Sequence, residues 1–138
     1  MGRNKDCYNV VIIDSGIGKY YRDYRDYYEG QVNFIFDECG AGKIFESEYF
    51  TGMHAFKVLS VMEKYKNNIK YRYHNYNIVN ESGRSSSLAL LRALTYLLDQ
   101  NDIDIVVACL SYDSKVYHNE IQKCCSRLRE KGKIIFIA

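Results

Sequence analysis

Short apolar runs, each ended by small or polar residues, recur along this chain and constrain its fold more than any other feature. The runs lie at 8–14, 31–36, 102–111 and 133–138. Because neighbouring positions in each run are apolar, both faces should be buried, which is typical of strands in a parallel sheet. The segment 69–79 alternates in polarity and is rich in residues that favour strands, so it predicts a further strand.

Helical patterns occupy much of the intervening sequence. They span 49–65, 87–101 and 115–132. Thr51 and either Ser86 or Ser87 should cap the first two helices, and Gly132 should end the third. The resulting order (strand, strand, helix, strand, helix, strand, helix, strand) predicts an α/β fold, an open parallel sheet with helices on both faces.

Length and charge limit the classes of protein to which this chain can belong. The chain has 138 residues, enough for one domain, and 47% of them are hydrophobic. A net charge of +2 is too small to create the positive electrostatic potential that attracts nucleic acid. No apolar stretch is long enough to span a membrane. The first residues lack the apolar core of a secretory signal, so we expect a cytoplasmic protein.

The cysteines also indicate a cytoplasmic protein. Their number is odd and none forms a CxxC pair, so we expect reduced thiols. Their spacing does not suit zinc, and no metal or other cofactor is expected. Cys109 should be a small core residue. The five are Cys7, Cys39, Cys109, Cys124 and Cys125.

The first predicted strand ends on a carboxylate, Asp14, which is followed by Ser-Gly-Ile-Gly. Sites in open α/β sheets lie at the carboxyl ends of strands, so this aspartate is a candidate functional residue. A phosphate-binding turn fits poorly because neither GxGxxG nor GxxxxGK[ST] is present. A phosphoacceptor aspartate fits poorly because no second acidic residue adjoins Asp14. The third interpretation, the aspartate of a serine peptidase, requires a histidine near the start of a following helix.

His54 meets that requirement. It lies in the predicted helix 49–65, with one predicted strand between it and Asp14. The stretches VVIIDSGIG and HAFKV resemble the aspartate and histidine motifs of the subtilisin-like serine peptidases, in the chain order of that family. Further on, NIVNESGRSSSLALLRALTYLLDQNDIDIVVACLS and LREKGKIIFIA resemble the next parts of the same fold, so the resemblance spans 8–138.

The resemblance implies roles for individual residues. Asp14 would be the carboxylate that fixes the imidazole tautomer, and His54 would be the general base that takes a proton from a serine hydroxyl. The family's substrate-binding strand, which pairs with an extended peptide, aligns with Cys109, Leu110 and Ser111.

The sequence departs from the family pattern beside both motifs. The Gly-Thr-His that follows the family's histidine is replaced by Ala55, Phe56 and Lys57. A phenylalanine at this position needs a pocket of its own. Ser111 stands where the substrate-binding strand has glycine, so a side chain occupies the expected path of the substrate.

The family's oxyanion asparagine and nucleophilic serine would both follow Ala138. We therefore expect residues 1–138 to be the amino-terminal portion of a subtilisin-like peptidase domain, incomplete at its C-terminal side and inactive alone. The expected partners are a peptide or protein substrate and a downstream segment or second polypeptide that supplies the serine and asparagine. The strand 133–138 should then be an exposed apolar edge.

Two other classes of function stay open. One is a non-catalytic module that retains the subtilisin-like fold for binding or as a scaffold. The other is an unrelated flavodoxin-like or receiver-like α/β domain. The tyrosine-rich segment 19–30, in which Arg-Asp-Tyr occurs twice, is expected to be a solvated, charge-balanced segment with half-buried tyrosines. The alternative is a surface that binds a substrate or partner, since tyrosine provides contact area at low entropic cost.

Overall fold

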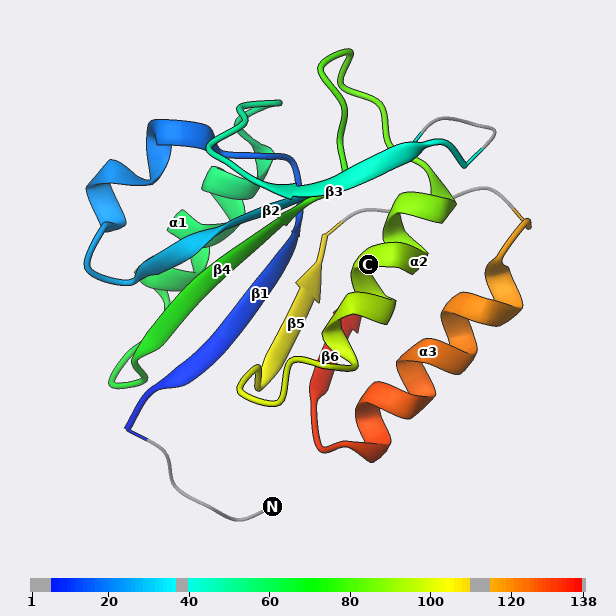
Figure 1. Cartoon of the computed structure of the whole chain (residues 1–138). Coiled ribbons are helices and arrows are strands. Elements are labelled where there is room, and N and C mark those ends of the chain that lie inside the picture. The colour runs from blue at the N-terminus through cyan, green and yellow to red at the C-terminus, as the bar shows by residue number, and fades with distance from the viewer. Residues whose placement is uncertain (1–5, 37–39, 110–114, 138) are drawn as a thin grey trace.

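The computed structural model describes residues 6–36, 40–109 and 115–137. Its centre is a six-stranded sheet in the order β3-β2-β4-β1-β5-β6 (Figure 1). All neighbouring strands are parallel except β2 and β3, which are antiparallel, so the sheet is mixed but mostly parallel. The strands are β1 (Tyr8–Asp14), β2 (Tyr28–Phe36), β3 (Gly42–Glu46), β4 (Tyr71–Asn77), β5 (Ile105–Ala108) and β6 (Ile134–Ile137).

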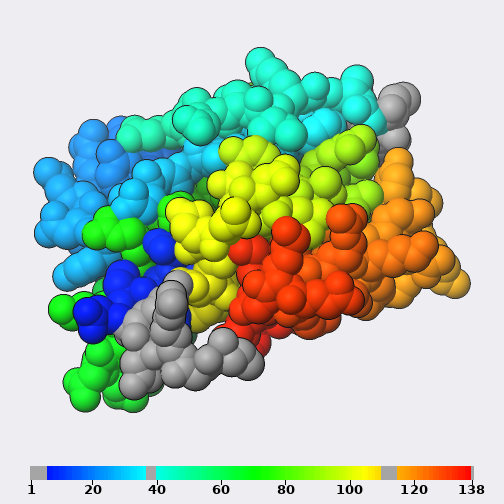
Figure 2. All heavy atoms as spheres, turned by 60° about the horizontal axis from the view of Figure 1, so that its bottom comes forward, coloured from blue at the N-terminus to red at the C-terminus, as the bar shows by residue number. Residues whose placement is uncertain are grey.

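Helices cover both faces of this sheet. The helix α1 (His54–Lys64) lies on one face, and α2 (Ser87–Leu97) and α3 (His118–Glu130) lie on the other (Figure 1). A 3₁₀ helix, η1 (Gly18–Tyr24), connects β1 to β2. Figure 2 shows α3 in orange and red next to the yellow-green atoms of α2. In the part of the chain that the structure describes, no helix is long and apolar enough to span a lipid bilayer.

Each face of the sheet has its own hydrophobic core. The larger core lies between the sheet and the helices α2 and α3, and the smaller lies between the sheet and α1. The amphipathic pattern of α2 explains its position, because it buries an almost continuous apolar stripe. The buried residues of α2 include Leu90, Ala93, Leu94 and Leu97.

The central strand is β1, which pairs with β4 on one side and β5 on the other. Val10, Val11 and Ile13 are completely buried, as expected for a strand covered on both faces. The pairing places Asp14 opposite Asn77 of β4, and Asn77 in turn lies opposite Asn33 of β2. The carboxyl ends of three adjacent strands therefore carry a row of polar side chains.

Most of the predicted elements are confirmed. Each of the five predicted strands and three predicted helices is present, and the Ser86 side chain caps α2 by accepting a hydrogen bond from Ala89 N at 3.1 Å. Gly132, with φ +88°, lies directly after Lys131, the C-cap residue of α3, as a helix-terminating glycine should. The general α/β fold predicted from the sequence is thus present.

The tyrosine-rich segment 19–30 forms η1 and the start of β2, which begins at Tyr28. It is solvated as expected, because most of its residues are exposed and Tyr21, Tyr24 and Tyr28 are half-buried.

Three expectations about local structure are wrong. The sheet is not wholly parallel, because the short antiparallel strand β3 adds to its edge. The helix expected from residue 49 begins at His54, and Thr51 does not cap it. Cys109, expected in the core, is exposed because it lies just beyond the end of β5.

The last strand also differs in part from its prediction. Ile135 is buried, but Ile134 and Phe136 are 52% and 60% exposed. The strand is therefore not buried on both faces, because α3 covers only one of them and α1 lies over β1 and β4 instead. The expectation of an exposed apolar edge is met within the described residues.

Phe34 offers a test of the larger core. Its completely buried ring lies 5.3 Å from the ring of Tyr76 and 5.4 Å from that of Tyr96. We expect Phe34→Ala to lower the free energy of unfolding by about 3–5 kcal/mol, because it opens a cavity between sheet and helix. Urea denaturation measures the change. The matched control is Phe50→Ala at a 45% exposed position, and this variant should lose clearly less free energy of unfolding. Equal losses of stability in the two variants would contradict this account of the core.

Candidate active site

Asp14 and His54 form a hydrogen-bonded pair at the carboxyl end of β1. The Nδ1 atom of His54 lies 2.7 Å from Oδ2 and 2.9 Å from Oδ1 of Asp14. The aspartate comes from the end of the central strand and the histidine from the first turn of α1. The structure therefore brings together the two residues that the sequence singled out.

The geometry of this pair assigns the histidine tautomer. An ionised carboxylate can only accept hydrogen bonds, so Nδ1 carries the proton of this bond, and in the neutral tautomer that fits it the lone pair is on Nε2. The side chain of Asp14 is only 4% exposed, whereas that of His54 is 58% exposed. The imidazole is thus open to solvent while its carboxylate partner stays buried, an arrangement that suits a general base.

Burial dominates the electrostatics of Asp14. Loss of water raises the pKa of its carboxyl above the ordinary value. Hydrogen bonds from Ser15 N, at 2.6 Å, and from His54 favour the charged form and oppose this rise. A carboxylate held in this way interacts more strongly with an imidazolium than an exposed one would.

Ser15 links the two halves of the pair. Its Oγ accepts a hydrogen bond at 3.1 Å from the backbone N–H of Ala55 in the first turn of α1, and it donates to Gly52 O at 3.4 Å. The residue after the aspartate therefore satisfies a free N–H of the helix that carries His54. This role had been expected of Thr51, which instead accepts a hydrogen bond from Gly16 N at 2.7 Å.

A glycine is required at position 16. A Cβ atom there would lie 2.1 Å from the backbone oxygen of Tyr49 and 2.6 Å from Nε2 of Gln31. The segment that follows Asp14 thus packs directly against the segment that precedes His54. Thr51 N donates to Gly16 O at 2.8 Å and closes this contact.

Four buried amide side chains, which the sequence analysis did not identify, hold these segments in place. They are Gln31, Asn33, Asn75 and Asn77, none more than 7% exposed. Asn75 accepts a hydrogen bond from Ile17 N at 3.2 Å and donates one to Ser15 O at 3.1 Å, so it holds the turn after Asp14 against β4.

Asn77 connects the two segments. Its Oδ1 accepts from Thr51 Oγ1 at 3.1 Å and from Val79 N at 2.9 Å, and its Nδ2 donates to Asn33 Oδ1 at 2.8 Å. Every donor and acceptor named here has a partner, which is the condition under which a buried polar network stabilises a structure.

Gln31 completes the network. It accepts from Gly18 N at 3.1 Å and donates to Asn33 Oδ1 and to Tyr49 O, each at 2.7 Å. A sequence signal for the network exists: amides occupy alternate positions in two predicted strands, at 31 and 33 and at 75 and 77. Uncharged groups that can both donate and accept are suited to such buried positions.

The residues expected to bind substrate are only partly described. Cys109 is exposed beside the end of β5, while Leu110 and Ser111 lie outside the described residues. Partial burial raises the pKa of the Cys109 thiol, and the negative charge of Asp14 raises it further. Because the thiolate is the reactive form, Cys109 is not activated as a nucleophile.

Phe56, which replaces a small residue of the family motif, has the pocket that it needs. Its ring lies 5.7 Å from that of Tyr24 in η1, and Tyr24 OH donates to Ser60 Oγ of α1 at 3.2 Å. The departure from the motif is therefore accommodated by the tyrosine-rich segment, and Phe56 is half-buried in the core beneath α1.

Neither protein-family models nor curated proteins give a match to this chain. The site therefore has to be interpreted from its geometry. Within the described residues, no group of three or more histidine, cysteine, aspartate or glutamate side chains is arranged to hold a metal ion.

Replacing Asn77 tests the amide network. Asn77→Leu leaves Val79 N without an acceptor, and each unsatisfied group of this kind costs about 1–3 kcal/mol. The Thr51 hydroxyl also loses its acceptor, and Asn33 Oδ1 loses one of its two donors. We expect urea denaturation to show a loss of several kcal/mol, and amide NMR spectra to show a large shift at Gly16. Asn101→Leu in an exposed turn is the control. A variant as stable as that control would contradict the role of the network.

A second prediction concerns the pH dependence of Asp14. Since the folded-state pKa is raised above the ordinary value of 3.8, the folded chain holds this proton more tightly than the unfolded chain. The contribution of Asp14 to stability therefore decreases as pH rises from about 3.8 through the folded-state pKa. Asp14→Asn removes this dependence. Urea denaturation across this pH range should show the wild type losing stability relative to the variant as pH rises, and a difference that stays constant with pH would contradict this account.

Proposed function

We propose that this chain supplies the aspartate and histidine of a subtilisin-like serine endopeptidase. The observation that carries the proposal is the bond from His54 Nδ1 to the buried carboxylate of Asp14, in a histidine whose side chain is mostly exposed. In such a pair the histidine takes a proton from a serine hydroxyl, and the aspartate stabilises the imidazolium that forms. The order of the two motifs in the sequence supports the same assignment.

The nucleophile has to come from elsewhere in the assembled enzyme. Across residues 6–36, 40–109 and 115–137, no serine or threonine hydroxyl is hydrogen-bonded to Nε2 of His54. We propose that a downstream segment or a second polypeptide supplies the serine together with the asparagine of the oxyanion hole. The substrate would be an extended peptide or protein segment that passes the end of β5, and the site would act in the cytoplasm.

The experiment joins this chain after residue 138 to the C-terminal half of a subtilisin-like peptidase that carries the serine and asparagine. We expect the fusion to hydrolyse a peptide nitroanilide and to react with a fluorophosphonate probe. Asp14→Asn should lower kcat by about 10⁴-fold, because the amide favours the wrong histidine tautomer. The unfused chain should react with neither reagent, because on this proposal the nucleophile and the oxyanion donor come from the fused half.

Controls distinguish folding from chemistry. The His54 Nδ1 proton, visible by NMR as a strongly deshielded signal when bonded to Asp14, reports whether the pair is intact in the fusion. His118→Ala on the exposed start of α3 is the matched control and should retain activity. A fusion with an intact pair and no hydrolysis would contradict the peptidase proposal and favour the non-catalytic subtilisin-like module.

A further inference from the structure

The outer side of β6 has the properties of a binding edge. Within the described residues β6 pairs with β5 on one side and has no strand partner on the other. Backbone N–H and C=O groups on such an edge are available to another strand. The exposed side chains of β6 are Ile134 and Phe136, both apolar.

The opposite edge of the sheet is protected in a way that β6 is not. There β3 carries exposed Lys43 and Glu46, and charged side chains on an edge strand oppose the addition of a further strand. The residues of β6 are Ile-Ile-Phe-Ile, with no charge among them. Of the two edges, only β6 is suited to pairing.

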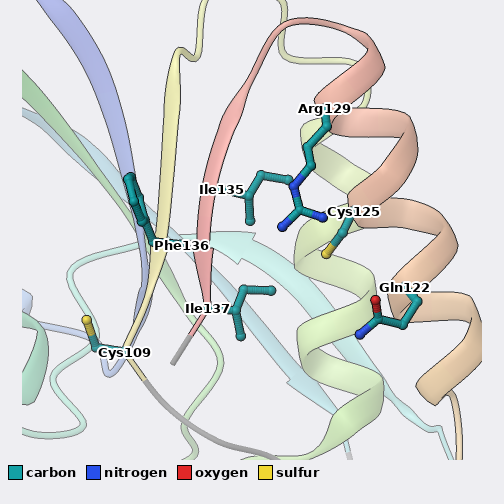
Figure 3. A pocket seen from close by; sticks show the side chains of 7 residues that line it. All are labelled: Cys109, Gln122, Cys125, Arg129, Ile135, Phe136 and Ile137. Carbon is teal, nitrogen blue, oxygen red and sulfur yellow. The ribbon is translucent and has the colours of Figure 1, made fainter.

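Two grooves flank β6, one on each face of the sheet. The groove on the α3 side has a volume of about 600 Å³, and Gln122, Cys125 and Arg129 of α3 line it (Figure 3). The groove on the α1 side has a volume of about 440 Å³. Cys109 and Phe136 line both grooves, so the two hollows meet at this edge of the sheet.

An added strand fits this shape better than a helix does. Successive side chains of a strand point to opposite faces, so alternate residues would enter alternate grooves while the backbone pairs with β6. A helix packed on one face would fill one groove and leave the other open.

The two grooves differ in chemistry. On the α1 side the lining is apolar apart from Lys57 at its rim, and includes Val58, Val61, Met62 and Val107. On the α3 side the guanidinium of Arg129 extends from the helix toward Ile135 (Figure 3). No ion pair within the described residues involves Arg129. A carboxylate on the incoming strand would complement it.

We propose that the edge of β6 binds an extended segment of another polypeptide by strand addition. Apolar side chains of that segment occupy the α1-side groove, and an acidic side chain meets Arg129 in the α3-side groove. This interaction surface requires no catalytic role for Asp14 or His54.

The test uses two soluble peptides with blocked ends, Val-Glu-Val-Glu-Val-Glu and Val-Lys-Val-Lys-Val-Lys. Both place valine on one face and a charge on the other. We expect the glutamate peptide to shift the backbone amide signals of 134–137 in an NMR titration and the lysine peptide to bind at least about tenfold more weakly. A glutamate peptide N-methylated on its pairing edge should not bind, because it cannot donate to β6.

Charge reversal on α3 tests the recognition of the carboxylate. Arg129→Glu should weaken binding of the glutamate peptide by about tenfold or more and strengthen that of the lysine peptide. Arg127→Glu, exposed on the same helix but outside the groove lining, should change neither. Thermal melting of both variants checks that each is folded.

Three outcomes would overturn the proposal. The first is binding of neither peptide, and the second is binding of the glutamate peptide that Arg129→Glu leaves unchanged. The third is a concentration-dependent dimer, detected by sedimentation and dissociated by Phe136→Lys, that excludes both peptides. In that case a second copy of this chain, and not an acidic segment, occupies the edge.

Discussion

The register between β1 and β4 is the constraint on which the site depends. It places Asp14 opposite Asn77, and the pairing of β4 with β2 places Asn77 opposite Asn33. A shift of one residue in either pairing would turn these side chains to the other face of the sheet. Because Val10, Val11 and Ile13 are completely buried, such a shift would also disrupt both hydrophobic cores. The packing of the sheet and the geometry of the Asp14–His54 pair are therefore specified together.

The sequence predicted those features that are encoded within single segments. Asp14 could be identified because it ends an apolar run, and His54 because it lies near the start of a predicted amphipathic helix. The bond between them follows from the direction of the strands, since a parallel sheet gathers the carboxyl ends of its strands at one edge. The strands and helices themselves were predictable from the period of their apolar residues.

Features that depend on contacts between distant segments could not be predicted in the same way. The amides at 31, 33, 75 and 77 resemble the solvent-facing positions of ordinary strands, and only the approach of the segments around Gly16 and Thr51 buries them. The strand β3 has Gly, Lys and Glu among its five residues, so its composition gives little indication of a strand. Cys109 belongs to an apolar run that extends beyond the end of the strand, which explains why its exposure was missed.

The hydrogen bond from Ala55 N to Ser15 Oγ has a consequence for how the molecule opens. Surface turns at the ends of strands are commonly the first parts of a protein to exchange their amide hydrogens. Here the turn after Asp14 is tied to the first turn of α1 through Ser15, and to the centre of the sheet through Asn75. We therefore expect fraying of the helix start and opening of the turn to be coupled. The Asp14–His54 pair should then open together with the ends of the central strands, although it lies at the surface of the molecule.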